Sequence, residues 1–345
     1  MAIQTQFNKF HDKIKLGRQD DAYKKARMRD TSITSDIKKR FAEEGYPVID
    51  DFLTGSHSTS TANYPLSGDF DIDRALVIDS DQAPENPLTP KKVIESVLEQ
   101  RGFKNAKIKK PCVTADYAGD NIHIDFTVYK KSGEHMYLAV GKKNADEQHR
   151  EWDDAAPKEL IAWITNDFIY LDSSGKKYSQ YRRIVRYLKR WRDKNFNDPV
   201  LSKVFSIALT AMAKECLMPE HDTEGFANDL SALRQTVNQI LNRGYFSCVD
   251  VEKQEYKVSV ALPVKPYRDI FHGSGTRTGT QLRNKLKSML KKLEAAEALD
   301  DVVKQSQIMQ EIFGEDFPVP DAETPNKKQA AVYPTAGAVG TSQGA

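Results

Sequence analysis

Residues 55–78, GSHSTSTANYPLSGDFDIDRALVI, and residues 123–129, HIDFTVY, are the stretches that decide the fold of this chain. In FDIDRALVI, which begins at residue 70, apolar and acidic side chains alternate, and this alternation predicts a β-strand. NIHIDFTVY alternates in the same way, and the VTADY before it predicts a hairpin whose turn lies at residues 118–121. Because every second side chain of a strand points to the same face, each strand is expected to present its acidic residues on one face.

Three aspartates fall on these acidic faces. Asp71 and Asp73 share a face and lie about 7 Å apart at their backbones, and Asp125 shares the polar face of the second strand with His123. If the two strands are neighbours in one sheet, Asp125 completes a cluster of three carboxylates. Such a cluster needs cations to offset its own repulsion, and its oxygen ligands suit Mg²⁺. Two ions about 3.5–4 Å apart, bridging an attacking and a leaving oxygen, are the established use of such a cluster.

Other interpretations of this segment stay open. A D-x-D pair also occurs as ordinary solvent-facing acids on a half-exposed strand. Asp69 lies on the same face as Asp71, so Asp69-Phe-Asp71 is an alternative pair. Arg74 stands where a small or apolar residue is more usual, and the sequence assigns no role to it.

Gly55 and Ser56 follow the apolar run VIDDFL and precede Asp71 by 16 and 15 residues. A Gly-Ser pair at such a point lets the backbone approach a triphosphate and offers N–H and hydroxyl donors. The alternative is a plain turn, which any lone Gly-Ser pair can form.

The composition bounds the kind of protein. The 345 residues carry a net charge of +2, with 39% hydrophobic and 29% charged residues, which is the balance of a globular protein in water. No run approaches the roughly 18 apolar residues of a membrane span, and the first residues lack the apolar stretch of a signal peptide. The three cysteines lie far apart without a C-x-x-C, which argues against a disulfide framework and a structural zinc site. A cytoplasmic location is the simplest expectation.

The chain is expected to be an α+β protein in three parts. Residues 1–160 combine an N-terminal helix with a mixed sheet, and residues 161–317 are mainly helical and close a cleft against it. Residues 318–345 have the composition of a disordered tail. Within the first part, KNAKIKKP at residues 104–111 is interpreted as a solvated basic face.

Taken together, Gly-Ser, a D-x-D strand and a later strand with a single Asp resemble the DNA polymerase β-like nucleotidyltransferase superfamily. Within it, GSHSTSTANYPLSGDFDIDRALVI and HIDFTVY look like the bacterial cGAS/DncV-like nucleotidyltransferases. The resemblance covers roughly residues 40–320. Further segments that fit it are LAVGKK (138–143), EWDDAAPKEL (151–160), IVRYLKRWR (184–192), VFSIALTAMA (204–213), VALPVKP (260–266) and FGEDFP (313–318).

The resemblance implies a polymerase β-like palm packed against a C-terminal helical domain. Asp71 and Asp73 would hold two Mg²⁺ ions, with Mn²⁺ as a substitute, together with the donor triphosphate. Asp125 would complete the site that activates the acceptor 2′- or 3′-hydroxyl. Gly55 and Ser56 would cradle the β- and γ-phosphates. Asp71/Asp73 is preferred over Asp69/Asp71 because a D-I-D followed by a strand fits the family better.

The resemblance also assigns two residues of the helical half to the triphosphate. Lys189 of YLKRW and Ser206 of VFSIAL match positions that contact it in this family. For Lys189 the alternative is a solvated face, since the segment carries many other basic residues. For Ser206 the alternative is a buried helical serine bonded to the backbone one turn earlier.

The implied function is synthesis of a cyclic oligonucleotide second messenger, a cyclic dinucleotide, in bacterial anti-phage defence. The substrates would be NTPs (ATP, with GTP or UTP as candidates), and a separate effector would bind the product. A ubiquitin-transfer-like partner acting at Ala345 is a further expectation, whereas activation by long DNA is not, because no zinc-binding insertion is found. The rivals are linear addition of nucleotides to an RNA, protein or small-molecule acceptor, and a catalytically inactive nucleotide sensor.

Overall fold

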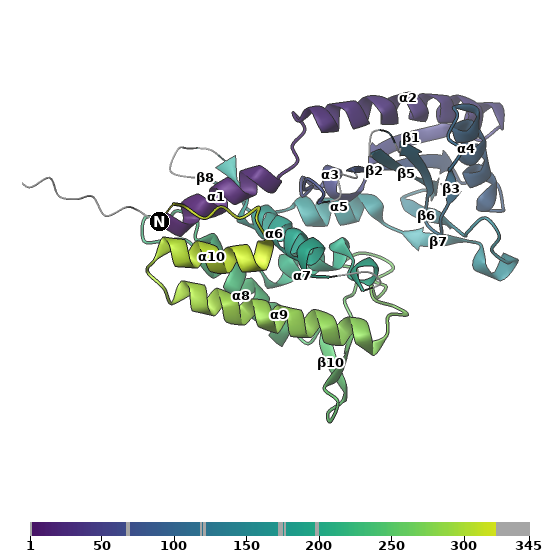
Figure 1. The fold of residues 1–345 in the computed structure, drawn as a ribbon. Helices are drawn as coiled ribbons and strands as arrows, with labels where there is room; N and C mark the ends of the chain where they lie inside the picture. Colours follow the sequence, from purple (N-terminus) through teal and green to yellow (C-terminus); the bar gives the residue numbers. More distant parts are fainter. Residues whose placement is uncertain are drawn as a thin grey trace, which may run out of the picture.

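A mixed β-sheet forms the centre of the N-terminal half (Figure 1). The computed structural model describes residues 2–66, 70–117, 119, 122–171, 175, 177–196 and 200–321. Within them, the sheet runs in the order β1-β2-β5-β4-β3, and β6 and β7 extend it from the far part of β5. Its strands are β1 (Val48–Leu53), β2 (Phe70–Asp79), β3 (Lys107–Ile108), β4 (Val113–Tyr117), β5 (Ile122–Ser132), β6 (His135–Val140) and β7 (Glu151–Ala155).

The predicted strands and the predicted hairpin are confirmed. Strands β4 and β5 pair antiparallel, and residues 118, 120 and 121 of the turn between them lie outside the described residues. Strand β2 lies beside β5 in parallel orientation, and β1 pairs antiparallel with the other edge of β2. The two aspartate-bearing strands are therefore direct neighbours.

One face of the sheet is covered by two helices, α2 (Asp21–Glu43) and α4 (Leu88–Gln100). The apolar side chains of β2 and β5 that alternate with the aspartates, such as Ile72 and Ile124, are fully buried in this core. The aspartates point to the opposite face, as expected from the period of two. Farther along that face, a small cluster forms around Val77 and Tyr129.

Arg74 is the exception on the apolar face, and the structure explains it. Its side chain is buried, with Nε bonded to Asp30 Oδ1 of helix α2 at 3.0 Å and Nη1 bonded to Asp51 Oδ2 of β1 at 2.9 Å. A second nitrogen, Nη2, also contacts the Asp30 carboxylate. Arg74 therefore ties helix α2 and strand β1 to the strand that carries Asp71 and Asp73.

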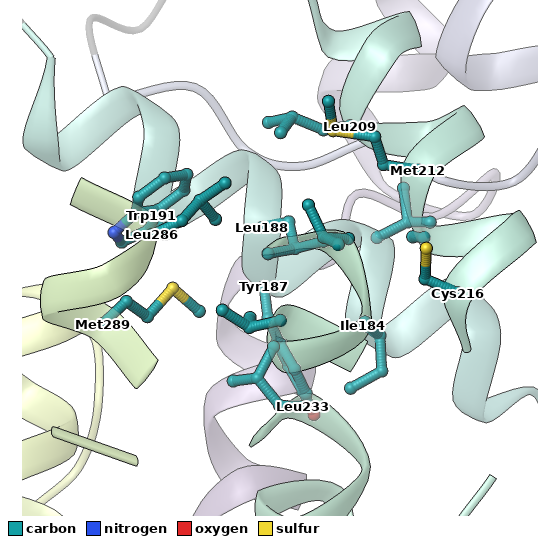
Figure 2. Packing of buried hydrophobic residues seen from close by; sticks show 14 of the residues in the cluster. Ile184, Tyr187, Leu188, Trp191, Leu209, Met212, Cys216, Leu233, Leu286 and Met289 are labelled. Atoms are coloured by element: carbon teal, nitrogen blue, oxygen red, sulfur yellow. The ribbon is translucent and has the colours of Figure 1, made fainter. Parts of the chain in front are cut away.

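The C-terminal half is built from helices packed around α6 (Figures 1 and 2). Figure 2 shows Tyr187, Leu188 and Trp191 of α6 packed among residues of three other helices, including Leu209 and Leu286. None of the described helices is long and apolar enough to cross a membrane. The helices are α5 (Pro157–Thr165), α6 (Gln180–Asn195), α7 (Ser206–Cys216), α8 (Asp229–Asn242), α9 (Thr276–Glu297) and α10 (Val302–Phe313), with short 3₁₀ turns at Glu147–His149 and Leu201–Lys203.

Two small sheets accompany these helices. Strand β11 (Glu255–Val258) pairs with β10 (Phe246–Asp250) in a hairpin that projects from the helices (Figure 1). Strands β8 (Tyr170–Leu171) and β9 (Lys177–Tyr178) form the other pair.

The N-terminal helix α1 (Ala2–Ile14) packs with the C-terminal helices, although the sequence groups it with residues 1–160. Its Phe10 stacks on Tyr187, with ring centroids 5.3 Å apart, and contacts Phe313 and Phe317. Helix α1 thus links the two ends of the chain. Of the tail predicted at residues 318–345, residues 322–345 lie outside the described residues.

Candidate active site

A cleft of about 910 Å³ lies between the acidic face of the sheet and the helical half. Its size is that of small-molecule sites in proteins. The cleft brings together every residue that the sequence assigned to the site. These are Gly55 and Ser56 after β1, Asp71 and Asp73 on β2, Asp125 on β5, Lys189 on α6 and Ser206 on α7.

The strand register places the three aspartates. Asp73 lies opposite Asp125 in the parallel pair of β2 and β5, and Asp71 lies opposite His123. Neighbouring strands are about 4.8 Å apart, so Asp73 and Asp125 are adjacent at their backbones. Asp71 is exposed and Asp73 is half-buried. Asp69, of the alternative pair Asp69/Asp71, lies outside the described residues.

Crowding of negative charge is strongest at Asp73. Burial, followed by the neighbouring carboxylates of Asp125 and Asp71, raises the pKa of Asp73 from 3.8 to about 7, although Lys189 and Lys109 oppose the change. Lys189 and Lys109 therefore neutralise only part of the negative charge around the Asp73 carboxylate. A set of oxygen ligands in that condition fits a hard divalent cation such as Mg²⁺.

Asp125 is engaged by protein donors. Thr114 Oγ1 donates a hydrogen bond to Asp125 Oδ1, and Lys109 Nζ lies 3.5 Å from the same oxygen. Among the described residues, no three His, Cys, Asp or Glu side chains are gathered closely enough to hold a metal ion as they stand. The donors needed for a metal site are present, and Asp125 would have to exchange its present partners to join them.

Sequence reasoning did not find Lys109 as a site residue. Lys109 is exposed, as expected for the solvated basic face at residues 104–111, and it also lines the cleft beside Asp125. Lys109 follows directly after β3, which pairs with β4, and β4 pairs with β5. Lys109 lies close to Asp125 because of the order of the strands in the sheet. No spacing of residues in the local sequence indicates this contact.

Gly55 meets two requirements that only glycine satisfies. Its φ of +62° lies in the left-handed region that side chains disfavour. A Cβ at this position would lie 1.9 Å from Asp73 Oδ2 and 2.7 Å from its Cγ. Nearby, the Thr54 N–H bonds to the Asp73 carbonyl at 2.9 Å. The Gly-Ser segment, with half-buried Ser56 also lining the cleft, is therefore packed directly on the Asp73 carboxylate.

Lys189 is buried against the loop that follows the Gly-Ser segment, so its interpretation as part of a solvated face is wrong. Its Nζ bonds to Thr61 O at 3.2 Å and to Thr61 Oγ1 at 3.1 Å. Burial, with Arg186 and Arg192 nearby, lowers the pKa of Lys189 to about 7. A triphosphate beside this ammonium group would favour its charged form.

The same helix also holds residues 60–64, which lie between the Gly-Ser segment and β2. Arg186 donates to the carbonyls of Ser60 at 2.5 Å and Ala62 at 3.2 Å. Arg190 donates to Tyr64 O at 2.6 Å, and Asn63 Nδ2 donates back to Arg186 O at 2.9 Å. The loop and α6 therefore form one wall of the cleft.

Ser206 is the first residue of α7, so no preceding turn of that helix is available to its hydroxyl. The alternative interpretation, a buried helical serine bonded to the backbone one turn earlier, is therefore wrong. Its Oγ accepts a hydrogen bond from Arg192, which lines the cleft as well and was not found from the sequence. The N-terminus of a helix carries unpaired N–H groups and partial positive charge, which favour a phosphate. The helical wall opposite the aspartates thus offers the Lys189 ammonium group, the Ser206 hydroxyl at a helix N-terminus and Arg192, which is paired with Asp193.

Another part of the cleft is apolar. Leu160, Ile161 and Ile164 come from helix α5, and Leu201 and Ile207 from the segment around the start of α7. Such a surface can accommodate a nucleobase or another flat apolar group. The cleft therefore combines an acidic floor, a wall with basic and hydroxyl side chains, and an apolar lining.

Comparison with known proteins agrees with this arrangement. Residues 1–167 match the model of the Second Messenger Oligonucleotide or Dinucleotide Synthetase domain. Residues 1–167 form a domain of this family. The resemblance to the bacterial cGAS/DncV-like nucleotidyltransferases is thereby confirmed. A curated relative of the synthetase domain, a cyclic GMP-AMP synthase of Escherichia albertii, is 25% identical over 173 residues, which cover 48% of this chain and 36% of that relative. The match spans little more than a third of the relative's length.

Solved structures with the same fold extend over the synthetase domain and the helical half. CdnG of Bradyrhizobium diazoefficiens in complex with GTP has a TM-score of 0.66 and 15% identity, covering 90% of this chain and 95% of that one. Escherichia coli CdnC with ATP has a TM-score of 0.59 and 15% identity, covering 91% and 98%. Vibrio cholerae DncV with nonhydrolyzable GTP has a TM-score of 0.59 and 18% identity, covering 92% and 79%. The predicted α+β fold, a polymerase β-like palm packed against a C-terminal helical domain, is confirmed.

Proposed function

We propose that this protein is a Mg²⁺-dependent nucleotidyltransferase that joins NTPs into a cyclic oligonucleotide, a cyclic dinucleotide, with release of pyrophosphate. The observation that carries the proposal is the convergence of Asp71, Asp73 and Asp125 with Lys189 and Ser206 on opposite walls of one cleft. The family of residues 1–167 supports it. The names of the relatives, a cyclic GMP-AMP synthase and complexes with GTP and ATP, make ATP and GTP the first substrates to test.

Residues on both walls of the cleft would bind the donor nucleotide. Lys189, Ser206 and the Gly55–Ser56 backbone would bind the donor triphosphate, because all of them line the cleft and supply an ammonium group, a hydroxyl or backbone N–H groups. The carboxylates of Asp71 and Asp73 would hold the cations that accompany it. When bound, Mg²⁺ neutralises phosphate charge and favours loss of the proton from the attacking hydroxyl.

The reaction itself is an exchange at phosphorus. The acceptor's 2′- or 3′-oxygen forms a bond to the α-phosphorus, the bond from that phosphorus to pyrophosphate breaks, and the hydroxyl proton passes to solvent. Asp125, beside Asp73, would serve the acceptor side of the cleft. A second transfer within the linear product closes the ring. The residues act mainly by positioning and by balancing charge.

A biological setting in anti-phage defence, with an effector that binds the product, is part of the same proposal. Attachment of the C-terminus to other proteins by a ubiquitin-transfer-like partner also belongs to it, although Ala345 lies outside the described residues. Deleting Gly344 and Ala345 should abolish conjugation in the presence of the cognate partner. Conjugation by the shortened chain would refute this part alone.

The product assay tests the central proposal. The protein is incubated with labelled NTP pairs and Mg²⁺, digested with phosphatase, and the products are resolved. A small product that resists phosphatase is expected, and Asp71→Ala should abolish it. A product that forms only with an added acceptor would indicate linear transfer. No product with either Mg²⁺ or Mn²⁺ would favour a nucleotide sensor, against which the complete set of aspartates argues.

A further inference from the structure

Lys109 has no role in the function proposed so far, yet it is in the cleft. Its Nζ lies 3.5 Å from Asp125 Oδ1, and about half of its side chain is exposed, at 49%. Asp125 is the carboxylate proposed to serve the acceptor side. The cation is therefore next to the group on which the acceptor nucleotide depends.

The order of the strands separates Lys109 from the donor side. Gly55 and Ser56 follow β1, which lies on one side of β2 and β5, whereas Lys109 follows β3, on the other side. The carboxylates of Asp73 and Asp125 lie between them. A nucleotide whose triphosphate is held at Gly55–Ser56 would leave Lys109 to the second nucleotide.

The backbone of Lys109 is fixed, while its side chain is free to turn. Lys91 of helix α4 is buried, and its Nζ donates to three carbonyl oxygens, of Lys109 at 2.7 Å, of Lys110 at 2.9 Å and of Gly141 at 2.8 Å. The Lys109 N–H also bonds to Cys112 O at 2.9 Å. This clamp holds the base of the side chain at the rim of the cleft, so the ammonium group can exchange one anionic partner for another.

We propose that Lys109 binds the phosphates of the acceptor nucleotide, after leaving Asp125 when that carboxylate takes up a metal ion. This inference rests on the proposed function. A cation bound by Asp125 would repel the Lys109 ammonium group, and the acceptor's own 5′-triphosphate is then the nearest anion that the reaction supplies. Lys109 would select acceptors, or linear intermediates, that carry a 5′-triphosphate over those that lack one.

The test compares Lys109→Ala with Lys110→Ala and Lys109→Arg. Lys110 is the matched control, because it shares the backbone clamp while its side chain is exposed and is not among the described residues that line the cleft. The protein is saturated with a nonhydrolysable NTP and Ca²⁺, and ATP or adenosine is then titrated in. Wild-type protein should bind ATP more tightly than adenosine, and Lys109→Ala should lose about two- to fivefold of that preference, as for loss of one partly exposed ion pair. Lys110→Ala and Lys109→Arg should keep it.

A second measurement follows metal binding at Asp125, the partner that Lys109 would leave. Without nucleotide, Lys109→Ala should bind Mn²⁺ about two- to fivefold more tightly than wild type, because a competitor for Asp125 is gone. If Lys109→Ala and Lys110→Ala give equal ATP preference, the proposal is overturned. Neither readout needs turnover, so absence of a cyclic product would count against the proposed function and leave these results to judge Lys109.

Discussion

Replacing Asp73 with Asn should stabilise the metal-free protein while abolishing its activity. The carboxylate is held among Asp125 and Asp71 in a half-buried position, and its pKa is raised from 3.8 to about 7. Above pH 7 the folded protein therefore bears an unfavourable charge that the unfolded chain solvates freely. Asn keeps the size and removes the charge.

The size of the effect follows from linkage. The folded state binds the Asp73 proton more tightly than the unfolded state, so the stability associated with that proton is present below about pH 4 and is lost as pH rises to about 7. The raised pKa of Asp73 lowers the free energy of unfolding by about 4 kcal/mol above pH 7, and by about 2 kcal/mol at about pH 5. Asp73→Asn should therefore raise the free energy of unfolding by up to about 4 kcal/mol at about pH 8, and by less at about pH 5.

Chemical denaturation of the metal-free protein at both pH values measures this. Asp71→Asn is the control: Asp71 is exposed, so the change should stay within about 1 kcal/mol at either pH. Mg²⁺ with a nonhydrolysable NTP should stabilise wild type and have little effect on Asp73→Asn. Destabilisation by Asp73→Asn at about pH 8, or a gain that does not grow with pH, would refute the reasoning.

Further outcomes follow from other contacts. Gly55→Ala places a Cβ against the Asp73 carboxylate at a φ of +62°, so product formation should fall at least about 100-fold, with a modest loss in unfolding free energy. Arg74→Met leaves the buried carboxylate of Asp30 with Arg27 as its partner, and should cost about 3 kcal/mol in urea unfolding; a neutral result would contradict the anchoring role of Arg74. Because the pKa values of Lys189 and Asp73 are both about 7, metal-free NTP binding should weaken as pH rises from about 6 to 8, and Lys189→Met should reduce that dependence to the part contributed by Asp73; a pH profile unchanged in Lys189→Met would show that Lys189 does not contribute.

The sequence predicted the strand positions of the three aspartates because strand periodicity is local. Alternation in FDIDRALVI and HIDFTVY was enough to put Asp71, Asp73 and Asp125 on polar faces, and the strand pairing then brought Asp73 and Asp125 together. The sequence also indicated the Gly-Ser pair as part of the site, but it did not show why a glycine is needed there. The need for glycine at residue 55 comes from the Asp73 side chain, which reaches it only in the folded protein.

The features that sequence reasoning missed or left open all depend on contacts between distant elements. Arg74 is explained by Asp30 and Asp51, which lie on another helix and another strand. Lys189 belongs to a run of basic residues whose burial depends on docking of α6 against the loop at residues 60–64. Lys109 approaches Asp125 across β4. Periodicity assigns a side chain to a face, but only packing decides what covers that face.

The central claim is that Asp71, Asp73 and Asp125 together hold the metal ions at the cleft. The direct measurement is the number of Mn²⁺ ions bound per chain in the presence of a nonhydrolysable NTP, for wild type and for each Asp→Asn variant. Wild type should bind about two ions, and each variant should lose at least one of them or bind it at least about tenfold more weakly. Undiminished Mn²⁺ binding by all three variants would contradict the account.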